Sequence, residues 1–227
     1  MLVREWMSKE VITVDADAFM QNAIDLLRQN EIKMLPVTDK NSLVGIITDR
    51  DIKRASISTE KMLSEKSYSD LYSKVRIRDI MTSSPITVYD DFTLEETAEV
   101  LLVNKISGVP IIDYGHRISG IITQTDIFRA FVLFTGVGKK GTQFAIDVID
   151  RPCCVKEVSE IIRAYAGRIS NIIISQSRAP SGHLILYVKA YNIKGPKLKR
   201  LEEKLCEKFK LLYIMDHDTN NRKIFSE

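Results

Sequence analysis

The chain has 227 residues, of which 44% are hydrophobic and 28% charged, and its formal net charge is +3. A chain of this length is typical of one large domain or two smaller ones, and its apolar fraction is ample for a packed core. The small net charge gives no support to a nucleic-acid-binding surface or an acidic tail.

Targeting signals and cysteine motifs are sparse. Residues 1–10 carry charges where a signal peptide needs an apolar run, and no apolar stretch reaches membrane-spanning length, so we expect a cytoplasmic protein without a membrane partner. The adjacent Cys153 and Cys154 cannot easily bridge, and Cys206 makes the number odd, so a disulfide framework is not expected. The three histidines are too scattered to predict a metal site.

The first 134 residues contain an internal repeat. The segment 3–8 aligns with 77–82, a shift of 74 residues, and the segment 32–39 aligns with 106–113 at the same shift. A repeat at a fixed period indicates one supersecondary unit used twice. Neither unit is large enough to bury its own sheet face and helices, so we expect the two to pack face to face across a pseudo-twofold axis.

In the first unit, the pattern predicts a β-branched strand at 11–14 and a helix whose apolar face falls in 20–27. Residues 34–47 hold two short apolar runs around a polar turn, which is typical of a hairpin, and a second helix begins near Asp49. The second unit repeats this order, with the apolar face of its first helix expected at Leu94, Ala98, Leu101 and Leu102. Residues 59–74 are predicted to form a linking helix.

A Gly-Ile-Ile strand followed by Thr-x-x-Asp closes each unit, at Thr48 and Asp51 in the first and at Thr123 and Asp126 in the second. The motif is also a helix-capping signature, so a helix cap and a ligand site are both open interpretations. A carboxylate suits the two hydroxyls of a ribose, whereas the hydroxyls and unpaired N–H groups of a helix start suit a phosphate.

Three motifs together resemble tandem cystathionine-β-synthase (CBS) domains over about residues 1–134: Arg-x-x-Met at the start, the Ile-x-x-x-Pro strand, and Gly-x-x-Thr-x-x-Asp at the end. Such a pair is called a Bateman module. The resemblance implies a regulatory, non-enzymatic protein that binds AMP, ADP, ATP or S-adenosylmethionine in clefts between the two units. An adenine nucleotide would then be a regulatory ligand, and no resident cofactor is required.

The resemblance also places each carboxylate opposite the other unit. One predicted cleft combines Thr48, Arg50 and Asp51 with Pro85, Ile86, Ile106, Ser107 and Gly108. The other combines Thr123, Thr125 and Asp126 with Val11, Ile12, Ile32, Lys33 and Met34. The apolar members are equally good core positions, and solvated surface charge is an alternative for Lys33 and Arg50. Because Ser107 and Gly108 offer no basic side chain, the sequence favours the Asp126 cleft for a phosphate-bearing ligand.

Beyond a Gly-rich linker at 135–142, residues 143–216 alternate in the order βαββαβ, which implies a ferredoxin-like sheet backed by two helices. With Asp150-Arg151-Pro152 after the first strand, this segment resembles an ACT domain, a small regulatory fold that often binds amino acids at dimer interfaces. A Gly usually follows that motif, and the Cys153 side chain would crowd a ligand, so sheet-to-sheet dimerisation is favoured over amino-acid binding. We expect a polar, mobile tail at 217–227.

These patterns predict an α+β or α/β chain of two pseudo-symmetric CBS units (βαββα), followed by an ACT-like domain, a combination that resembles bacterial proteins associated with acetoin utilisation. The predicted divisions are 1–58, 59–74, 75–134, 135–142, 143–216 and 217–227. No catalytic motif, nucleic-acid-binding helix pair or metal motif supports another class. The expected partners are an adenosine-containing small molecule, a second copy in a homodimer and an unidentified protein target. The alternative is a structural or interaction protein with empty clefts and an ACT-like dimerisation sheet.

Overall fold

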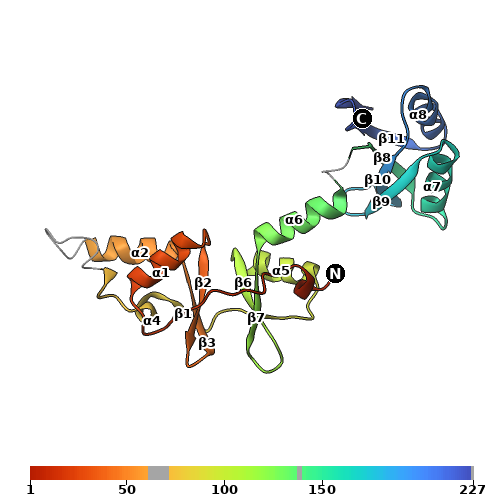
Figure 1. The fold of residues 1–227 in the computed structure, drawn as a ribbon. Coiled ribbons are helices and arrows are strands. Elements are labelled where there is room, and N and C mark those ends of the chain that lie inside the picture. Colours follow the sequence, from red (N-terminus) through yellow and green to blue (C-terminus); the bar gives the residue numbers. More distant parts are fainter. Residues whose placement is uncertain (61–71, 137–139, 226–227) are drawn as a thin grey trace. The chain divides into compact units, whose positions relative to one another are not determined.

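The computed structural model describes residues 1–60, 72–136 and 140–225. The chain separates into two compact units, Met1–Arg129 and Ala130–Glu227 (Figure 1). The division falls inside a helix, α6 (Gln124–Thr135), and not in the segment predicted as a linker. Most of the predicted linking helix at 59–74 lies outside the described residues. Among the helices that are described, none is long and apolar enough to cross a membrane.

The first unit holds the two repeats. The first repeat consists of η1 (Val3–Glu5), β1 (Val14–Asp15), α1 (Met20–Gln29), β2 (Met34–Asp39), β3 (Ser42–Thr48) and α2 (Asp49–Glu60). The second consists of α4 (Ile77–Ile80), β4 (Thr82–Ser83), β5 (Val88–Tyr89), α5 (Leu94–Asn104), β6 (Gly108–Ile112), β7 (Ile118–Thr123) and α6. The strand orders are β1-β2-β3-β4 and β5-β6-β7. Each repeat therefore has a parallel pair followed by an antiparallel hairpin.

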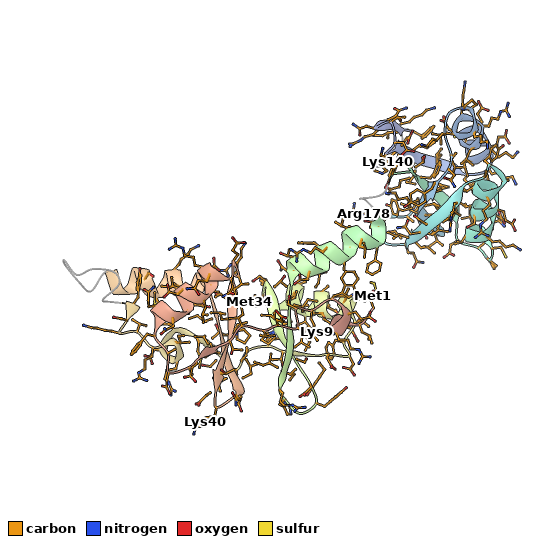
Figure 2. The ribbon with its side chains drawn as sticks, in the orientation of Figure 1. Met1, Lys9, Met34, Lys40, Lys140 and Arg178 are labelled. Carbon is orange, nitrogen blue, oxygen red and sulfur yellow. The ribbon has the colours of Figure 1, made fainter. Side chains whose placement is uncertain are left out.

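Two details of the predicted repeat were wrong. The strand predicted at 11–14 is regular only from Val14, because β1 pairs with β2 at just two positions. On α5 the buried stripe is Leu94, Thr97 and Leu101, whereas the Leu102 side chain is 73% exposed. A shift of one position turns a helical side chain by about 100°, which carries Leu102 from the core to the surface. The hairpin turn is as predicted, with Lys40 at its tip (Figure 2). Lys40 and Asn41 have φ of 50° and 68°.

Each repeat begins with a segment that packs on the other repeat. The N–H of Val3 donates to the carbonyl of Phe92 (2.7 Å), and Ser8 forms a β-bridge with Ile121 in β7. Reciprocally, the N–H of Ile77 donates to the carbonyl of Ala18 (2.9 Å), and β4 pairs with β3. The two repeats are thus interlocked by exchange of their leading segments, and neither sheet is complete without the other repeat.

The Met of each Arg-x-x-Met segment packs on a glycine of the other repeat. A Cβ atom on Gly45 would overlap the Met81 sulfur and lie 3.1 Å from the carbonyl oxygen of Thr82. At the equivalent position, a Cβ atom on Gly120 would overlap the Met7 sulfur and lie 2.7 Å from its Cγ atom. Glycine at these strand positions permits the close approach of the exchanged segments, which explains why both motifs recur together.

The second unit is one antiparallel sheet with the strand order β12-β11-β8-β10-β9. Its elements are β8 (Thr142–Ile149), α7 (Cys154–Ala164), β9 (Arg168–Ser175), β10 (His183–Tyr191), α8 (Pro196–Lys208), β11 (Lys210–Asp216) and β12 (Asn221–Ile224). Residues of α7 and α8 pack in one core with Phe144, Ile146 and Leu186, so both helices cover the same face of the sheet (Figure 1).

The polar tail predicted at 217–227 contains a strand instead. Asp216 organises the turn that leads into β12, because its carboxylate accepts hydrogen bonds from the N–H of Asp218 (3.0 Å) and the hydroxyl of Thr219 (2.7 Å). The chain then reverses and pairs with β11, and Lys223 forms an ion pair with Glu202 of α8. The prediction was wrong because three of the four residues of β12 are polar and its pairing depends on this turn.

Candidate functional site

The first Thr-x-x-Asp motif lies where β3 turns into α2. The carboxylate of Asp51 accepts hydrogen bonds at Oδ2 from the N–H (3.0 Å) and the hydroxyl (2.6 Å) of Thr48. The Thr48 hydroxyl in turn accepts from the N–H of Asp51 (3.3 Å). These reciprocal bonds are those of a capping box, so the helix-cap interpretation is confirmed at this position.

The second motif lies at the equivalent junction between β7 and α6. Oδ2 of Asp126 accepts from the N–H (2.9 Å) and the hydroxyl (2.7 Å) of Thr123. The other carboxylate oxygen, Oδ1, accepts from the guanidinium of Arg129 (3.0 Å), and the Asp126 side chain is only 15% exposed. The two motifs therefore differ: Asp126 has an ion-pair partner in the next helical turn.

Capping does not exclude ligand binding at these carboxylates. A carboxylate offers about four acceptor positions, and the cap occupies two of them on a single oxygen, Oδ2. At Asp51 this leaves Oδ1 for the hydroxyl groups of a ligand. At Asp126 a ligand hydroxyl would share Oδ1 with Arg129, whose side chain is 73% exposed and is therefore able to move.

A cavity of about 690 Å³ lies beside Asp51, between the two repeats. All eight residues predicted for this cleft line it: Thr48, Arg50 and Asp51 from the first repeat, and Pro85, Ile86, Ile106, Ser107 and Gly108 from the second. The sequence missed three charged residues that also line it, Asp49, Arg54 and Lys105. Ser107 and Gly108 offer no basic side chain, but Lys105, two residues before Ser107, supplies one from the second repeat.

A second cavity, of about 480 Å³, lies beside Asp126. Its lining includes all eight residues predicted for the other cleft: Thr123, Thr125 and Asp126 from the second repeat, and Val11, Ile12, Ile32, Lys33 and Met34 from the first. Three charged residues were again missed, Glu10, Glu31 and Arg129. Glu31 and Lys105 each precede a predicted residue by one position, so inspection of that neighbour would have found both.

Met34, Ser107 and Gln124 line both cavities and form the wall between them. Met34 and Gly108 occupy equivalent positions in the two repeats, at the shift of 74 residues that relates residues 3 and 77. A Cβ atom on Gly108 would lie 2.7 Å from the terminal carbon of Met34, so the glycine makes room for the methionine. The pseudo-symmetry is therefore broken at the contact between the repeats, and the two clefts have different shapes.

Comparison with known proteins identifies the repeats. A family model described as CBS domain matches residues 3–58 and 77–133. A CBS domain-containing protein of Dictyostelium discoideum is 32% identical over 135 residues, which cover 58% of this chain and 91% of that protein. The chain belongs to the CBS domain family, and residues 3–133 hold a tandem pair.

The matches extend to a part of a longer enzyme and to a solved CBS domain pair. An inosine-5'-monophosphate dehydrogenase of Methanocaldococcus jannaschii is 34% identical over 122 residues, 53% of this chain and 22% of the enzyme. Among solved structures, the CBS domain pair of protein MJ0100, in complex with 5'-methylthioadenosine and S-adenosyl-L-methionine, is 33% identical with a TM-score of 0.50. That match covers 58% of this chain and 99% of the domain pair. Both alignments are therefore consistent with a match to the CBS pair.

In the second unit, Cys153 follows Asp150-Arg151-Pro152 and has a φ of 71°. This left-handed conformation is the one glycine adopts most readily, so a cysteine here is strained. A cavity of about 470 Å³ nearby is lined in part by His183 and the buried Asp147. Nδ1 of His183 lies 2.6 Å from Oδ1 of Asp147. Within the described ranges, no group of three His, Cys, Asp or Glu side chains is arranged to hold a metal ion.

Proposed function

We propose that this protein is a regulatory sensor that binds adenosine-containing ligands in the two clefts between its CBS repeats, without a catalytic role of its own. The observation that carries the proposal is the pair of equivalent cavities, each with a Thr-x-x-Asp helix start from one repeat and strand residues from the other. The adenosyl ligands of the MJ0100 domain pair support this ligand class.

Each part of such a ligand has a complementary group in the cleft. The ribose hydroxyls would donate to the free oxygen of Asp51, and the positive end of the α2 dipole favours a negatively charged group near the helix start. Ile86 and Ile106 provide apolar surface for the adenine ring. In the Asp126 cleft, the repeat-equivalent residues Ile12 and Ile32 provide this apolar surface.

For the second unit we propose an ACT-like domain that pairs subunits and passes on the ligand state of the clefts. The element order βαββαβ supports this assignment, as does the strand order β11-β8-β10-β9, in which β8 and β10 are the central pair. The Cys153 side chain, at a left-handed position that glycine would leave open, argues against amino-acid binding, so we propose dimerisation as the role of this sheet. Exposed apolar side chains on α5, Leu102 (73%) and Val103 (72%), offer a further surface for a second copy. A cytoplasmic location and a separate protein target remain predictions.

Thermal unfolding with AMP, ADP, ATP, S-adenosylmethionine and 5'-methylthioadenosine tests the proposed function. A ligand at about a hundred times its dissociation constant should stabilise the chain by roughly 2.7 kcal/mol. Asp51→Asn and Asp126→Asn keep an oxygen for the helix cap but lose the charged acceptor, so each should remove the contribution of one cleft.

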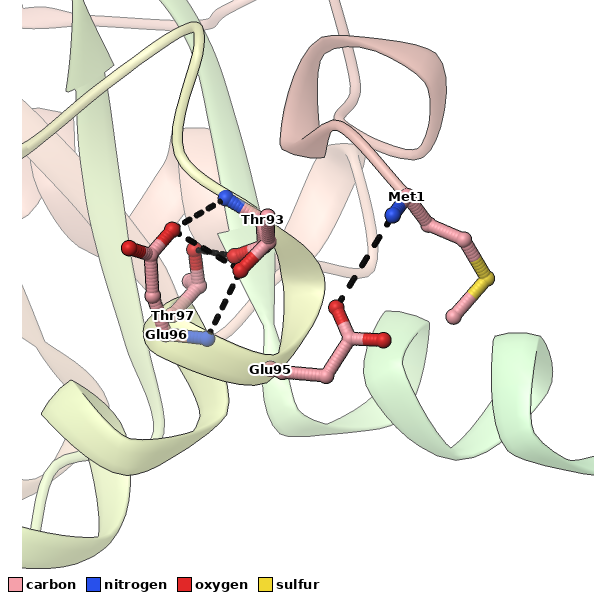
Figure 3. A network of polar contacts seen from close by, with 5 residues as sticks. All are labelled: Met1, Thr93, Glu95, Glu96 and Thr97. Atoms are coloured by element: carbon pink, nitrogen blue, oxygen red, sulfur yellow. Dashed lines mark hydrogen bonds and ion pairs between the residues drawn. The ribbon is translucent and has the colours of Figure 1, made fainter. Parts of the chain in front are cut away.

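The chain contains a matched control for these two variants. At the start of α5, Glu96 accepts from the N–H and the hydroxyl of Thr93 (2.8 Å each), and the N–H of Glu96 donates back to that hydroxyl (3.1 Å), as Figure 3 shows. This is the same cap, but neither residue lines either cleft. Glu96→Gln should therefore lower stability while leaving every ligand-induced shift unchanged. If no ligand stabilises the wild type, the alternative of a structural protein with empty clefts is favoured.

A further inference from the structure

We infer that the two clefts select ligands of opposite charge. The Asp51 cleft takes a phosphate-bearing adenosine such as AMP, and the Asp126 cleft takes an adenosine without phosphate, above all one that carries a sulfonium cation. This inference rests on the proposed function, because it assumes that both clefts bind adenosine. It reverses the preference expected from the sequence, which assigned the phosphate to the Asp126 cleft on the strength of Lys33.

The clearest evidence is a charge reversal at equivalent positions. Glu31 and Lys105 are related by the repeat and have the same left-handed backbone, with φ of 53° and 54°. The next residue closes the same turn in both: the N–H of Ile32 donates to Leu27 (3.0 Å), and that of Ile106 donates to Leu101 (3.1 Å). The two side chains thus leave identical turns and line opposite clefts, one as a carboxylate and the other as an ammonium group.

The remaining charged residues follow the same division. The Asp51 cleft is lined by three basic and two acidic residues, namely Arg50, Arg54, Lys105, Asp49 and Asp51. The Asp126 cleft is lined by two basic and three acidic residues, namely Lys33, Arg129, Glu10, Glu31 and Asp126. Sequence equivalence pairs Glu10 with the neutral Ser84, which lines the Asp51 cleft.

One ion pair increases this difference, and a second leaves it unchanged. In the Asp51 cleft, the carboxylate of Asp49 lies 3.4 Å from the ammonium of Lys53, which is not among the lining residues, so one of the two negative charges is already partnered. In the Asp126 cleft, Arg129 is paired with Asp126 itself at 3.0 Å. Lys33 is then the remaining basic side chain of the lining, against Glu10 and Glu31.

Isothermal titration of the full chain with AMP, S-adenosylmethionine and 5'-methylthioadenosine tests the inference. The last two ligands share an adenosine with sulfur at its 5' position, as a charged sulfonium in the first and a neutral thioether in the second, so 5'-methylthioadenosine reports the integrity of the cleft. Asp126→Asn isolates the Asp51 cleft, which should prefer AMP. Asp51→Asn isolates the Asp126 cleft, which should prefer S-adenosylmethionine over AMP.

Charge exchanges in these two backgrounds give the decisive measurement. In the Asp126→Asn background, Lys105→Glu should weaken AMP binding about fivefold or more, because a unit charge a few ångströms away in water is worth roughly that factor. In the Asp51→Asn background, Glu31→Lys should strengthen AMP binding and weaken S-adenosylmethionine binding by a similar factor. Binding of 5'-methylthioadenosine should change less than about twofold in both, since it carries no charge.

Three outcomes overturn the inference, and they are distinguishable. If AMP and S-adenosylmethionine follow 5'-methylthioadenosine in every variant, the cleft charges do not select. If both isolated clefts prefer the same ligand, the assignment of the clefts is wrong. If none of the three ligands binds the wild-type chain, the proposed function itself fails. As an independent check, higher salt should weaken AMP and S-adenosylmethionine binding but not 5'-methylthioadenosine binding.

Discussion

Replacing Gly45 with alanine tests the interlocking of the repeats that creates both clefts. Gly45 lies in β3, and the added methyl group would overlap the Met81 sulfur and lie 3.1 Å from both Met81 Cγ and the carbonyl oxygen of Thr82. The side chain of Met81 is able to move, but the carbonyl belongs to β4, which is paired with β3. The substitution must therefore displace the exchanged segment or strain it.

The expected cost follows from two opposing terms. Overpacking a close contact costs typically about 1–3 kcal/mol, whereas alanine in an extended strand restores about 0.4–1 kcal/mol by restricting the unfolded chain. The net loss should be about 1–2 kcal/mol, which lowers the melting temperature of a unit of this size by roughly 4–8 °C. Differential scanning calorimetry of the full chain would measure the effect on the transition of the first unit.

A double-mutant cycle separates this steric effect from any other. Met81→Ala removes the larger side chain, so Gly45→Ala should cost much less in that background, and the two changes should be strongly non-additive. The pair Gly120→Ala and Met7→Ala repeats the test at the equivalent position. Strict additivity in both cycles, or a stable Gly45→Ala protein with intact ligand binding, would refute the interlocked packing.

Three further predictions concern individual side chains. Burial lowers the pKa of His217, with Lys189 contributing, so the unfolded chain binds its proton more readily. The stability contributed by His217 should be full above about pH 6.5 and should be lost as the pH falls through the lower pKa of the folded state. His217→Gln should remove this pH dependence in urea titrations at pH 5–8. The backbone N–H of Thr93 lowers the pKa of Glu96, so its contribution should disappear only below about pH 4.3, and Glu96→Gln should flatten the acid limb. Cys153→Gly should raise the unfolding free energy by roughly 0.5–1 kcal/mol in urea titration, because glycine relieves the left-handed strain; a loss of stability would show that the turn is not strained.

The internal repeat is what made the clefts predictable from sequence. One Thr-x-x-Asp motif predicts a helix cap and nothing more, but two copies at a fixed shift place each carboxylate against the other repeat. All sixteen residues predicted from the family resemblance line the two cavities on which they were expected. Their role in binding remains a prediction, whereas their position follows from the exchange of leading segments between repeats.

The features that the sequence did not predict depend on the direction of single side chains and on strand pairing that local sequence does not encode. Leu101 and Leu102 are adjacent, so only one of them can face the core, and the apolar pattern of this helix does not decide which. Strand β12 has no apolar alternation, and it exists because Asp216 reverses the chain beside β11. Lys105 follows the last residue of a helix, where a basic side chain is ordinarily solvated, and its position in the cleft lining comes with a left-handed turn that no sequence motif marks.

The equivalent positions of the two repeats separate what the fold requires from what it leaves open. Gly45 and Gly120, with the methionines that pack on them, are the same in both repeats because any side chain there would separate the interlocked segments. Glu31 and Lys105 are exposed, so the turn tolerates either charge without a packing cost. Divergence at such positions changes the electrostatic potential of a cleft while the helix cap and the strand pairing stay intact. A duplicated unit can in this way acquire two ligand preferences on one framework.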